Sequence, residues 1–194
     1  KFMKVKIYKR FERFWHWGQA FLVIMLVLTG FEVHGRFFSI FGYDLAVDLH
    51  RDFAWALIIL IAFAVFWHFT TGEWRQYIPT GEHIKEMFRY YFEGIFKGEM
   101  HPTKKTELSK LNPLQRITYF LLKVFLFPVQ VGSGLLYMYY NDLNIDLTTI
   151  ATIHVIGTYL FLVFLILHLY LTTTGHTPTS NIKAMITGWE EVER

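Results

Sequence analysis

The sequence predicts an all-α fold, an integral membrane four-helix bundle whose helices run alternately up and down. Of its 194 residues, 53% are hydrophobic and only 18% are charged. Four apolar segments reach the roughly 20 residues that a helix needs to cross a bilayer. Their apolar residues do not recur with a period of two, and a chain in lipid must pair its own backbone groups, so helices are favoured over strands.

The expected spans cover about residues 14–33, 50–72, 114–140 and 148–174, within a single membrane domain of residues 1–194. The apolar cores of the first, second and fourth spans carry no formal charge, and the third contains only Lys123. Lys123 is expected near one membrane surface, where its aliphatic stem allows the ammonium group to reach water.

The positions of Lys and Arg predict the topology. Residues 1–13 contain six, residues 73–116 eight, residues 32–52 two, and residues 140–149 none. Because cytoplasmic loops are enriched in Lys and Arg, both termini and the long central loop are expected in the cytoplasm. The expected location is a bacterial or archaeal cytoplasmic membrane. The first fourteen residues are too charged and aromatic for a cleaved signal peptide, so we expect the first span to be retained.

The central loop contains GEHIKEMFRYYFEGIF, residues 81–96, which predicts an amphipathic helix between the second and third spans. Its apolar face would comprise Ile84, Met87, Phe88, Tyr91, Phe92, Ile95 and Phe96. Such a helix lies on the cytoplasmic membrane surface or docks on a partner protein, and the sequence leaves both open. The tail NIKAMITGWEEVER likewise binds a partner or lies on the membrane.

Histidines are the main candidates for function, because a histidine in a membrane span is costly unless it is paired. Five lie in or beside the spans: His16, His50, His68, His154 and His168. In the predicted topology, His50 and His154 lie near the outer surface, and His16, His68 and His168 lie near the inner surface. His154 and His168 are fourteen residues apart, about 21 Å along one helix face.

This pattern of histidines favours two haem b groups. Zinc would need four ligands at one point, and copper or non-haem iron would bring carboxylate, Cys or Met ligands. The chain has no cysteine, which excludes iron–sulfur clusters held by its own thiolates. A haem b needs one imidazole on each side of a flat ring. His50 with His154 would form the outer pair, and His168 with either His16 or His68 the inner pair.

Small and basic residues are consistent with a bound macrocycle. Glycines within the spans would let a ring approach the backbone, although glycine is also common where helices simply pack. These are Gly18, Gly30, Gly132, Gly134 and Gly157. Arg13 with Arg10 inside, and Arg51 with Arg36 outside, are candidates to pair with the haem propionates, and setting the topology is their alternative role.

The first span, RFERFWHWGQAFLVIMLVLTGF, resembles the start of membrane cytochrome b subunits. These subunits serve respiratory formate dehydrogenases, nickel–iron hydrogenases and thiosulfate reductase-like enzymes. The resemblance covers nearly the whole chain and implies a di-haem bundle that passes electrons between a periplasmic partner and the quinone pool. It implies His16 and His168 as ligands of the inner haem and His50 and His154 as ligands of the outer haem, with His68 near the inner site.

The segment KLNPLQR, residues 110–116, resembles the part of that family in which an Asn and a Gln line the quinone pocket. These would be Asn112 and Gln115, whose amides suit the carbonyls of menaquinone or ubiquinone. Asn112 before Pro113 is also a good helix cap, for which Gln115 is not needed. His68, Lys123 and His83 are weaker candidates for a proton route.

HFTTG (68–72) and HLYLTTTG (168–175) end their helices similarly, and an internal repeat would make His68 the inner ligand; His16 remains the first choice and His68 the alternative. The expected partner is a periplasmic iron–sulfur or multihaem cytochrome c subunit, alongside quinone and membrane lipid, with no nucleic acid. The chain would be an electron-transfer subunit of a quinone-linked oxidoreductase complex, without a catalytic domain of its own. The alternative is a haem-containing membrane anchor that has no quinone site.

Overall fold

The computed structural model describes residues 2–35, 38–99, 102–103, 106, 109–143, 145–175 and 177–193. Within these ranges, four helices are long and apolar enough to cross a membrane, which confirms the predicted fold class. They are α1 (Arg10–Gly35), α2 (Tyr43–Thr71), the helical segments from Pro113 to Met138, and α7 (Leu147–Thr172). The chain divides into two compact units, residues 10–73 and residues 1–9 with 74–194.

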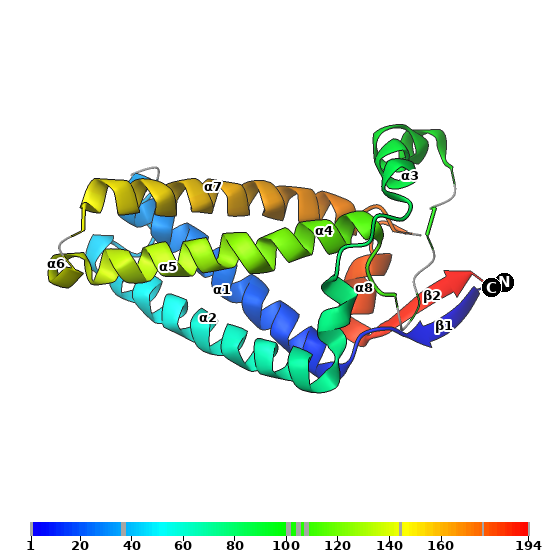
Figure 1. The fold of residues 1–194 in the computed structure, drawn as a ribbon, viewed down its shortest axis with the longest axis horizontal. Helices are drawn as coiled ribbons and strands as arrows, with labels where there is room; N and C mark the ends of the chain where they lie inside the picture. Colours follow the sequence, from blue (N-terminus) through cyan, green and yellow to red (C-terminus); the bar gives the residue numbers. More distant parts are fainter. Residues whose placement is uncertain are drawn as a thin grey trace. The chain divides into compact units, whose positions relative to one another are not determined.

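The unit of residues 10–73 is a hairpin in which α1 and α2 run antiparallel (Figure 1). The helices approach closely at Gly18, where a Cβ would lie 3.3 Å from Cδ2 of Leu60. α2 begins at Tyr43 rather than near residue 50, because its polar first turns stay helical outside the apolar core and bury Ala46 completely. It ends at Gly72, whose φ of 76° is a left-handed conformation that glycine adopts without strain.

The loop between α1 and α2 is held by Glu32, which is only 7% exposed. Its carboxylate accepts hydrogen bonds from the backbone N–H groups of Ile40, Phe41 and Gly42 at 3.0, 3.0 and 2.7 Å. The Ser39 hydroxyl donates a further bond at 3.1 Å. The carboxylate of Glu32 therefore stabilises this loop through hydrogen bonds.

The third span consists of α4 (Pro113–Leu121), a π-helical turn (Leu122–Leu126) and α5 (Phe127–Met138). Pro128 explains the π turn, because proline has no N–H to donate and its ring crowds the carbonyl four residues earlier. α5 packs antiparallel to α7, with the rings of Phe127 and Phe161 edge to face at 5.0 Å. A short helix, α6 (Tyr140–Leu143), precedes α7.

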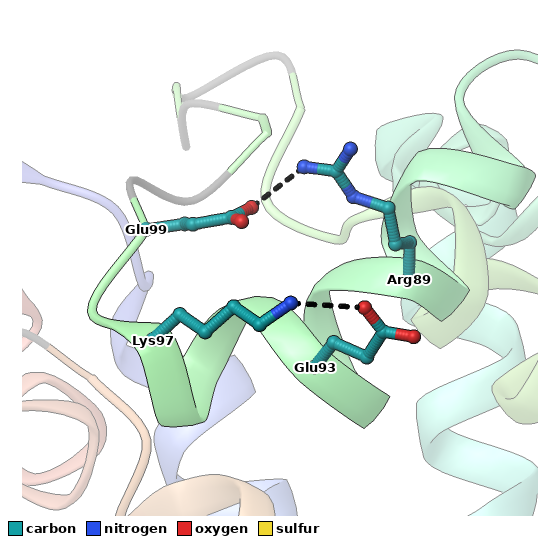
Figure 2. Close-up of polar contacts among 4 residues, drawn as sticks. All are labelled: Arg89, Glu93, Lys97 and Glu99. Carbon is teal, nitrogen blue, oxygen red and sulfur yellow. Dashed lines mark hydrogen bonds and ion pairs between the residues drawn. The ribbon is translucent and has the colours of Figure 1, made fainter.

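The segment between the second and third spans is helical where the sequence predicts it, over α3 (Ile84–Arg89), a π turn (Tyr90–Gly94) and a 3₁₀ turn (Ile95–Lys97). An earlier 3₁₀ turn spans Glu73–Tyr77. The predicted apolar face is part buried and part exposed. Met87 is fully buried, whereas Phe88, Phe92 and Phe96 are 46%, 74% and 77% exposed. Figure 2 shows the ion pairs Arg89–Glu99 at 2.7 Å and Lys97–Glu93 at 3.2 Å, which bridge the turns of this segment.

A two-stranded antiparallel sheet, which the sequence analysis does not anticipate, joins the two ends of the chain (Figure 1). β1 (Phe2–Lys6) pairs with β2 (Trp189–Glu193), and Lys4 lies opposite Glu191. α8 (Ser180–Thr187) leads into β2 through Gly188, whose φ is 88°. The end of the tail thus pairs with the N-terminal segment of the same chain. The sequence alone leaves open what this tail binds.

Many large apolar side chains of the long helices are exposed. Phe66 and Phe69 on α2 are each 67% exposed, and Ile166 on α7 is 64% exposed. A soluble protein would bury side chains of this size, whereas a bilayer solvates them. The exposed apolar surface therefore supports a membrane location for both units.

Candidate functional site

His50 lies near the start of α2, against two consecutive residues of α1. Its Nδ1 is 3.0 Å from Oγ1 of Thr29, a residue with no exposed surface. The Thr29 hydroxyl also donates to the carbonyl of Met25, at 2.8 Å. A Cβ on Gly30 would lie 3.2 Å from Cε1 of His50. α1 thus supplies both a hydrogen-bonding partner and the space for this imidazole.

His154 on α7 has equivalent surroundings in the other unit. Its Nδ1 lies 3.0 Å from Oγ of Ser133 on α5, and that hydroxyl donates to the carbonyl of Gln130 at 3.1 Å. A Cβ on Gly134 would lie 3.2 Å from Cε1 of His154. In both units, a hydroxyl residue followed by glycine faces a histidine on the next long helix.

The amide of Gln130 lies beside the same imidazole. Its Nε2 is 3.2 Å from Nε2 of His154 and donates to the Thr158 hydroxyl at 3.1 Å. Its Oε1 is buried and has no hydrogen-bond partner among the described residues. Gly157 leaves the space that this amide fills, because any Cβ there would collide with Oε1.

His68 and His16 lie at the opposite end of the hairpin from His50. His68 is 6% exposed, and its Nδ1 lies 2.6 Å from the carbonyl oxygen of Ala64. The rings of Trp15 and Trp67 meet the His68 ring edge to face at 5.2 and 5.1 Å. His16 is half-buried, and its ring packs edge to face on Trp17 at 5.1 Å.

His168 lies near the end of α7, where it faces α4. Its Nδ1 is 3.4 Å from the hydroxyl oxygen of Tyr119. Its ring stacks on Phe164, with centroids 5.8 Å apart and planes inclined by 10°. His154 and His168 are therefore both half-buried, each beside a hydroxyl group of the third span.

Each unit holds histidines at two levels along its helices. In the hairpin of α1 and α2, His50 touches the Thr29–Gly30 level, whereas His16 lies fourteen residues earlier on α1, about 21 Å away. In the other unit, His154 and His168 are separated by the same number of residues on one helix. Each unit therefore carries imidazoles at two levels along its own helices.

The donor set fits haem better than a metal ion held by protein alone. No group of three or more His, Asp or Glu side chains converges on one point within the described ranges. Haem iron takes four nitrogens from its porphyrin and needs only axial imidazoles from the protein. Gly30 and Gly134 leave room beside His50 and His154, whereas nothing lies within 4 Å of a Cβ built on Gly132.

The arginines proposed for the propionates have different surroundings. Arg51 forms ion pairs with Asp48 at 3.1 Å and Asp52 at 3.5 Å, and its side chain is 49% exposed. Arg13 is half-buried near the start of α1, where Arg10 is the first residue. Arg36 lies outside the described residues.

Asn112 and Gln115 form a reciprocal cap at the start of α4. Asn112 Oδ1 accepts from the backbone N–H of Gln115 at 2.8 Å, and Gln115 Oε1 accepts from the backbone N–H of Asn112 at 3.1 Å. The expectation that Gln115 is not needed for the cap is therefore wrong, because both side chains belong to it. Asn112 Nδ2 donates to the hydroxyl of Tyr91 at 3.0 Å.

The structure shows the surroundings of Tyr91 and of two candidates for a proton route, Lys123 and His83. Burial raises the pKa of Tyr91, and the hydrogen bond from Asn112 partly offsets this. Lys123 places its Nζ 3.2 Å from the ring centroid of Tyr77, so its ammonium rests on an aromatic face rather than extending freely to water. His83 precedes α3 with a φ of 55° and is exposed.

Sequence reasoning missed the hydroxyl partners of the histidines, namely Thr29, Ser133 and Tyr119. Composition gives no sign of them, because which residues of one helix face a histidine on another depends on packing register. A usable signal exists in hindsight. The dipeptides Thr29–Gly30 and Ser133–Gly134 place a hydroxyl beside a glycine, each on the span that precedes a histidine-bearing span.

Comparison with known proteins identifies the family of this chain. Residues 7–188 match the family model for prokaryotic cytochrome b561. The putative cytochrome YdhU of Escherichia coli (strain K12) is 29% identical over 96% of this chain and 74% of its own length. No solved structure shows a significant match. The expected resemblance to membrane cytochromes b is confirmed. The chain therefore belongs to the prokaryotic cytochrome b561 family and is a multi-pass membrane cytochrome that binds haem b.

Proposed function

We propose that this cytochrome carries two haem b groups and transfers electrons across the membrane between a periplasmic redox partner and the quinone pool. The observation that carries the proposal is the presence of histidines at two levels in each of two units. The chain belongs to a family of electron-transfer cytochromes, and the haem iron, when bound, supplies reversible one-electron transfer. The protein's part is to hold each haem and to bring one of them beside quinone.

His50 and His154 are the proposed axial ligands of the outer haem. Each ring is half-buried, and each has a glycine beside it and a hydroxyl at its Nδ1. Arg51 is the proposed partner of a propionate on this haem. Its exposed pairs with Asp48 and Asp52 cost little to exchange, because surface ion pairs contribute about 0–1 kcal/mol.

His16 and His168 are the proposed axial ligands of the inner haem, with Arg13 near a propionate. His68 is the alternative to His16, and one observation favours it. A bond from Nδ1 of His68 to the Ala64 carbonyl leaves the lone pair on Nε2, as iron ligation requires. The packing of its ring against two indoles favours the opposite view, that His68 is a buried neighbour of the site.

Separate replacement of His16 and His68 by alanine distinguishes these ligands. We expect the His16→Ala protein to retain one haem b of two and the His68→Ala protein to retain both. The measurement is haem per chain by pyridine haemochrome in purified protein. Loss of one haem with His68→Ala alone would make His68 the ligand.

The quinone is proposed to bind beside Gln115 and Asn112, as menaquinone or ubiquinone. Gln115 uses its oxygen in the cap, and within the described residues no hydrogen bond is assigned to its Nε2. That nitrogen is suited to donate to a quinone carbonyl. Tyr119, one helical turn after Gln115, reaches His168, so this end of α4 adjoins a proposed ligand of the inner haem.

The second candidate function is a haem-containing anchor without a quinone site. The reciprocal cap favours it, because the cap alone accounts for Asn112 and for the oxygen of Gln115. In that case a partner subunit would carry out the exchange with quinone, and the two amides would matter only for the stability of α4.

Replacements that retain the cap separate the two functions. Glu at position 115 and Asp at position 112 both cap helices well, but each lacks the amide N–H donors. We expect Gln115→Glu to keep full haem content and to lose quinol-linked electron transfer about tenfold or more, as the loss of a hydrogen bond to a reacting carbonyl implies. Asn112→Asp provides a second test. Wild-type rates in both variants would support the anchor.

The proposed topology places both termini in the cytoplasm, following the Lys and Arg distribution. A reporter enzyme that is active only in the periplasm, fused after residue 194, should be inactive, whereas a cytoplasmic reporter should be active. The reverse result would invert the assignment of inner and outer haems. Purification of the intact complex from its native membrane should recover a periplasmic iron–sulfur or multihaem cytochrome c subunit.

A further inference from the structure

We infer that Thr29 and Ser133 are positioning residues, which hold His50 and His154 with Nε2 free of hydrogen and directed to iron. The inference rests on the proposed role of these histidines as axial ligands. It extends that role to two residues that do not touch the haem iron and that act only through the imidazoles.

The hydrogen-bond pattern determines which atom donates. A hydroxyl has one hydrogen, and Thr29 gives its hydrogen to the Met25 carbonyl at 2.8 Å. The oxygen of Thr29 is then left as an acceptor, so the His50 Nδ1 at 3.0 Å must carry the hydrogen of that bond. A neutral imidazole protonated at Nδ1 has its lone pair on Nε2, which is the atom that can bind iron.

Ser133 favours the same tautomer of His154 in the other unit. Its hydroxyl donates to the Gln130 carbonyl at 3.1 Å and lies 3.0 Å from Nδ1 of His154. The Gln130 amide nitrogen lies 3.2 Å from Nε2 and 3.4 Å from Nδ1 of the same ring, so it does not distinguish the two nitrogens, and the tautomer of His154 rests on Ser133. Two units with different sequences therefore use one arrangement.

The adjacent glycines make the arrangement a support for ligands rather than a chance hydrogen bond. A Cβ at Gly30 or Gly134 would lie 3.2 Å from the Cε1 atom of the corresponding histidine. Each ring thus has a hydroxyl at its Nδ1 and occupies space that a side chain larger than glycine would fill. Metal-bound histidines commonly gain orientation and basicity in this way, from a partner at the nitrogen that does not bind metal.

The chemical consequence is a change in redox potential. An acceptor at Nδ1–H makes the imidazole a stronger electron donor, which favours ferric over ferrous iron. Removal of the acceptor should therefore raise the midpoint potential of the haem that this histidine binds. A hydroxyl that merely satisfied a buried imidazole would affect stability without shifting a potential.

The test uses Thr29→Val and Ser133→Ala in the full chain, purified with its haem. Thr29→Ser and Ser133→Thr restore the hydroxyl and should restore wild-type behaviour. Thr152→Val is the matched control, because the Thr152 hydroxyl bonds to the Thr148 carbonyl of its own helix at 2.8 Å and lies only two residues from His154. Haem per chain and the two midpoint potentials are measured for each protein.

We expect Thr29→Val and Ser133→Ala each to weaken haem retention about 10–100-fold, the usual cost of losing such a partner. The haem that remains should titrate at a higher potential, and both variants should shift the same one of the two transitions. Full haem content with unshifted potentials in both would overturn the inference. The two hydroxyls belong to separate units. If one variant protein does not fold and accumulate in the membrane, the other variant still tests the inference.

Failure of the proposed function gives a different result. If the wild-type chain holds fewer than two haems, or if His50→Ala and His154→Ala retain full haem, then the ligand assignment itself is wrong. If those two variants each lose a haem while Thr29→Val and Ser133→Ala match the wild type, the ligands stand and only the positioning role is lost.

Discussion

Two glycines of α5, only two residues apart, show how closely individual residues are matched to the histidines. A Cβ on Gly134 would lie 3.2 Å from Cε1 of His154, whereas a Cβ on Gly132 would meet nothing within 4 Å among the described residues. The two positions have the same helical backbone and differ in what a methyl group would contact. Alanine at each position therefore distinguishes an effect on the histidine site from an effect on helix stability.

We predict that Gly134→Ala lowers haem content, because His154 must move by a few tenths of an ångström to accommodate the new methyl group, a strain of about 1–3 kcal/mol. Gly132→Ala should keep full haem content and gain about 0.5–1 kcal/mol from helix propensity. Haem per chain and thermal unfolding of both variants check this. Equal haem contents in the two proteins would argue against a tight fit at His154.

Glu32 is a second residue whose role is visible only in the structure. Glu32→Gln should lower the midpoint of thermal unfolding, because it removes the negative charge that accepts from three backbone N–H groups and places an NH₂ group opposite the N–H of Phe41. Glu86→Gln, at an exposed position of α3, is the control and should leave the midpoint unchanged. If both variants melt with the wild type, Glu32 does not stabilise the loop.

At the scale of the elements, the start of α7 depends on Asp146. Its carboxylate accepts from the Thr149 hydroxyl and from the backbone N–H groups of Thr149 and Thr148 at 2.8 and 3.4 Å. The hydrogen bond from the Thr149 side chain, with the backbone bond from the same residue, lowers the pKa of Asp146. α7 carries His154 and His168, so this cap anchors the helix that holds two proposed ligands.

The lowered pKa predicts a pH dependence with a definite sign. The charged cap stabilises the fold fully above the unfolded pKa of about 3.9, and this contribution is lost as the pH falls through the lower folded value. The difference in melting temperature between wild type and Asp146→Asn should therefore be constant above about pH 5 and shrink below about pH 4. A difference that grows toward acid would contradict this.

The four spans were predictable because membrane crossing depends on length and apolar composition, which the sequence states directly. The early start of α2 was not, because Asp44, Asp48 and Asp52 belong to polar turns outside the apolar core. The sheet of β1 and β2 was also missed, since each strand has five residues and its partner lies at the other end of the chain.

For the site, the histidines could be found from the sequence, but their neighbours could not. Imidazoles stand out in apolar spans, so five candidates were evident. That Thr29 faces His50, and Ser133 faces His154, depends on which helix faces meet. The cap role of Gln115 was likewise decided by a side-chain conformation, which composition does not determine.

At the scale of the whole molecule, two units that differ in sequence carry histidines at two levels, with the same hydroxyl and glycine support at one of them. The proposed transfer between the two sides of the membrane needs two haems, since one haem alone would not extend across about 30 Å of hydrocarbon. This proposal therefore requires two haems per chain.

The most direct test is the amount of haem b per chain in the purified wild-type protein, measured by pyridine haemochrome against protein from amino-acid analysis. We predict two haems per chain, and an accompanying redox titration should resolve two transitions. One haem per chain, or none, would contradict the proposal that this cytochrome conducts electrons between the two membrane surfaces.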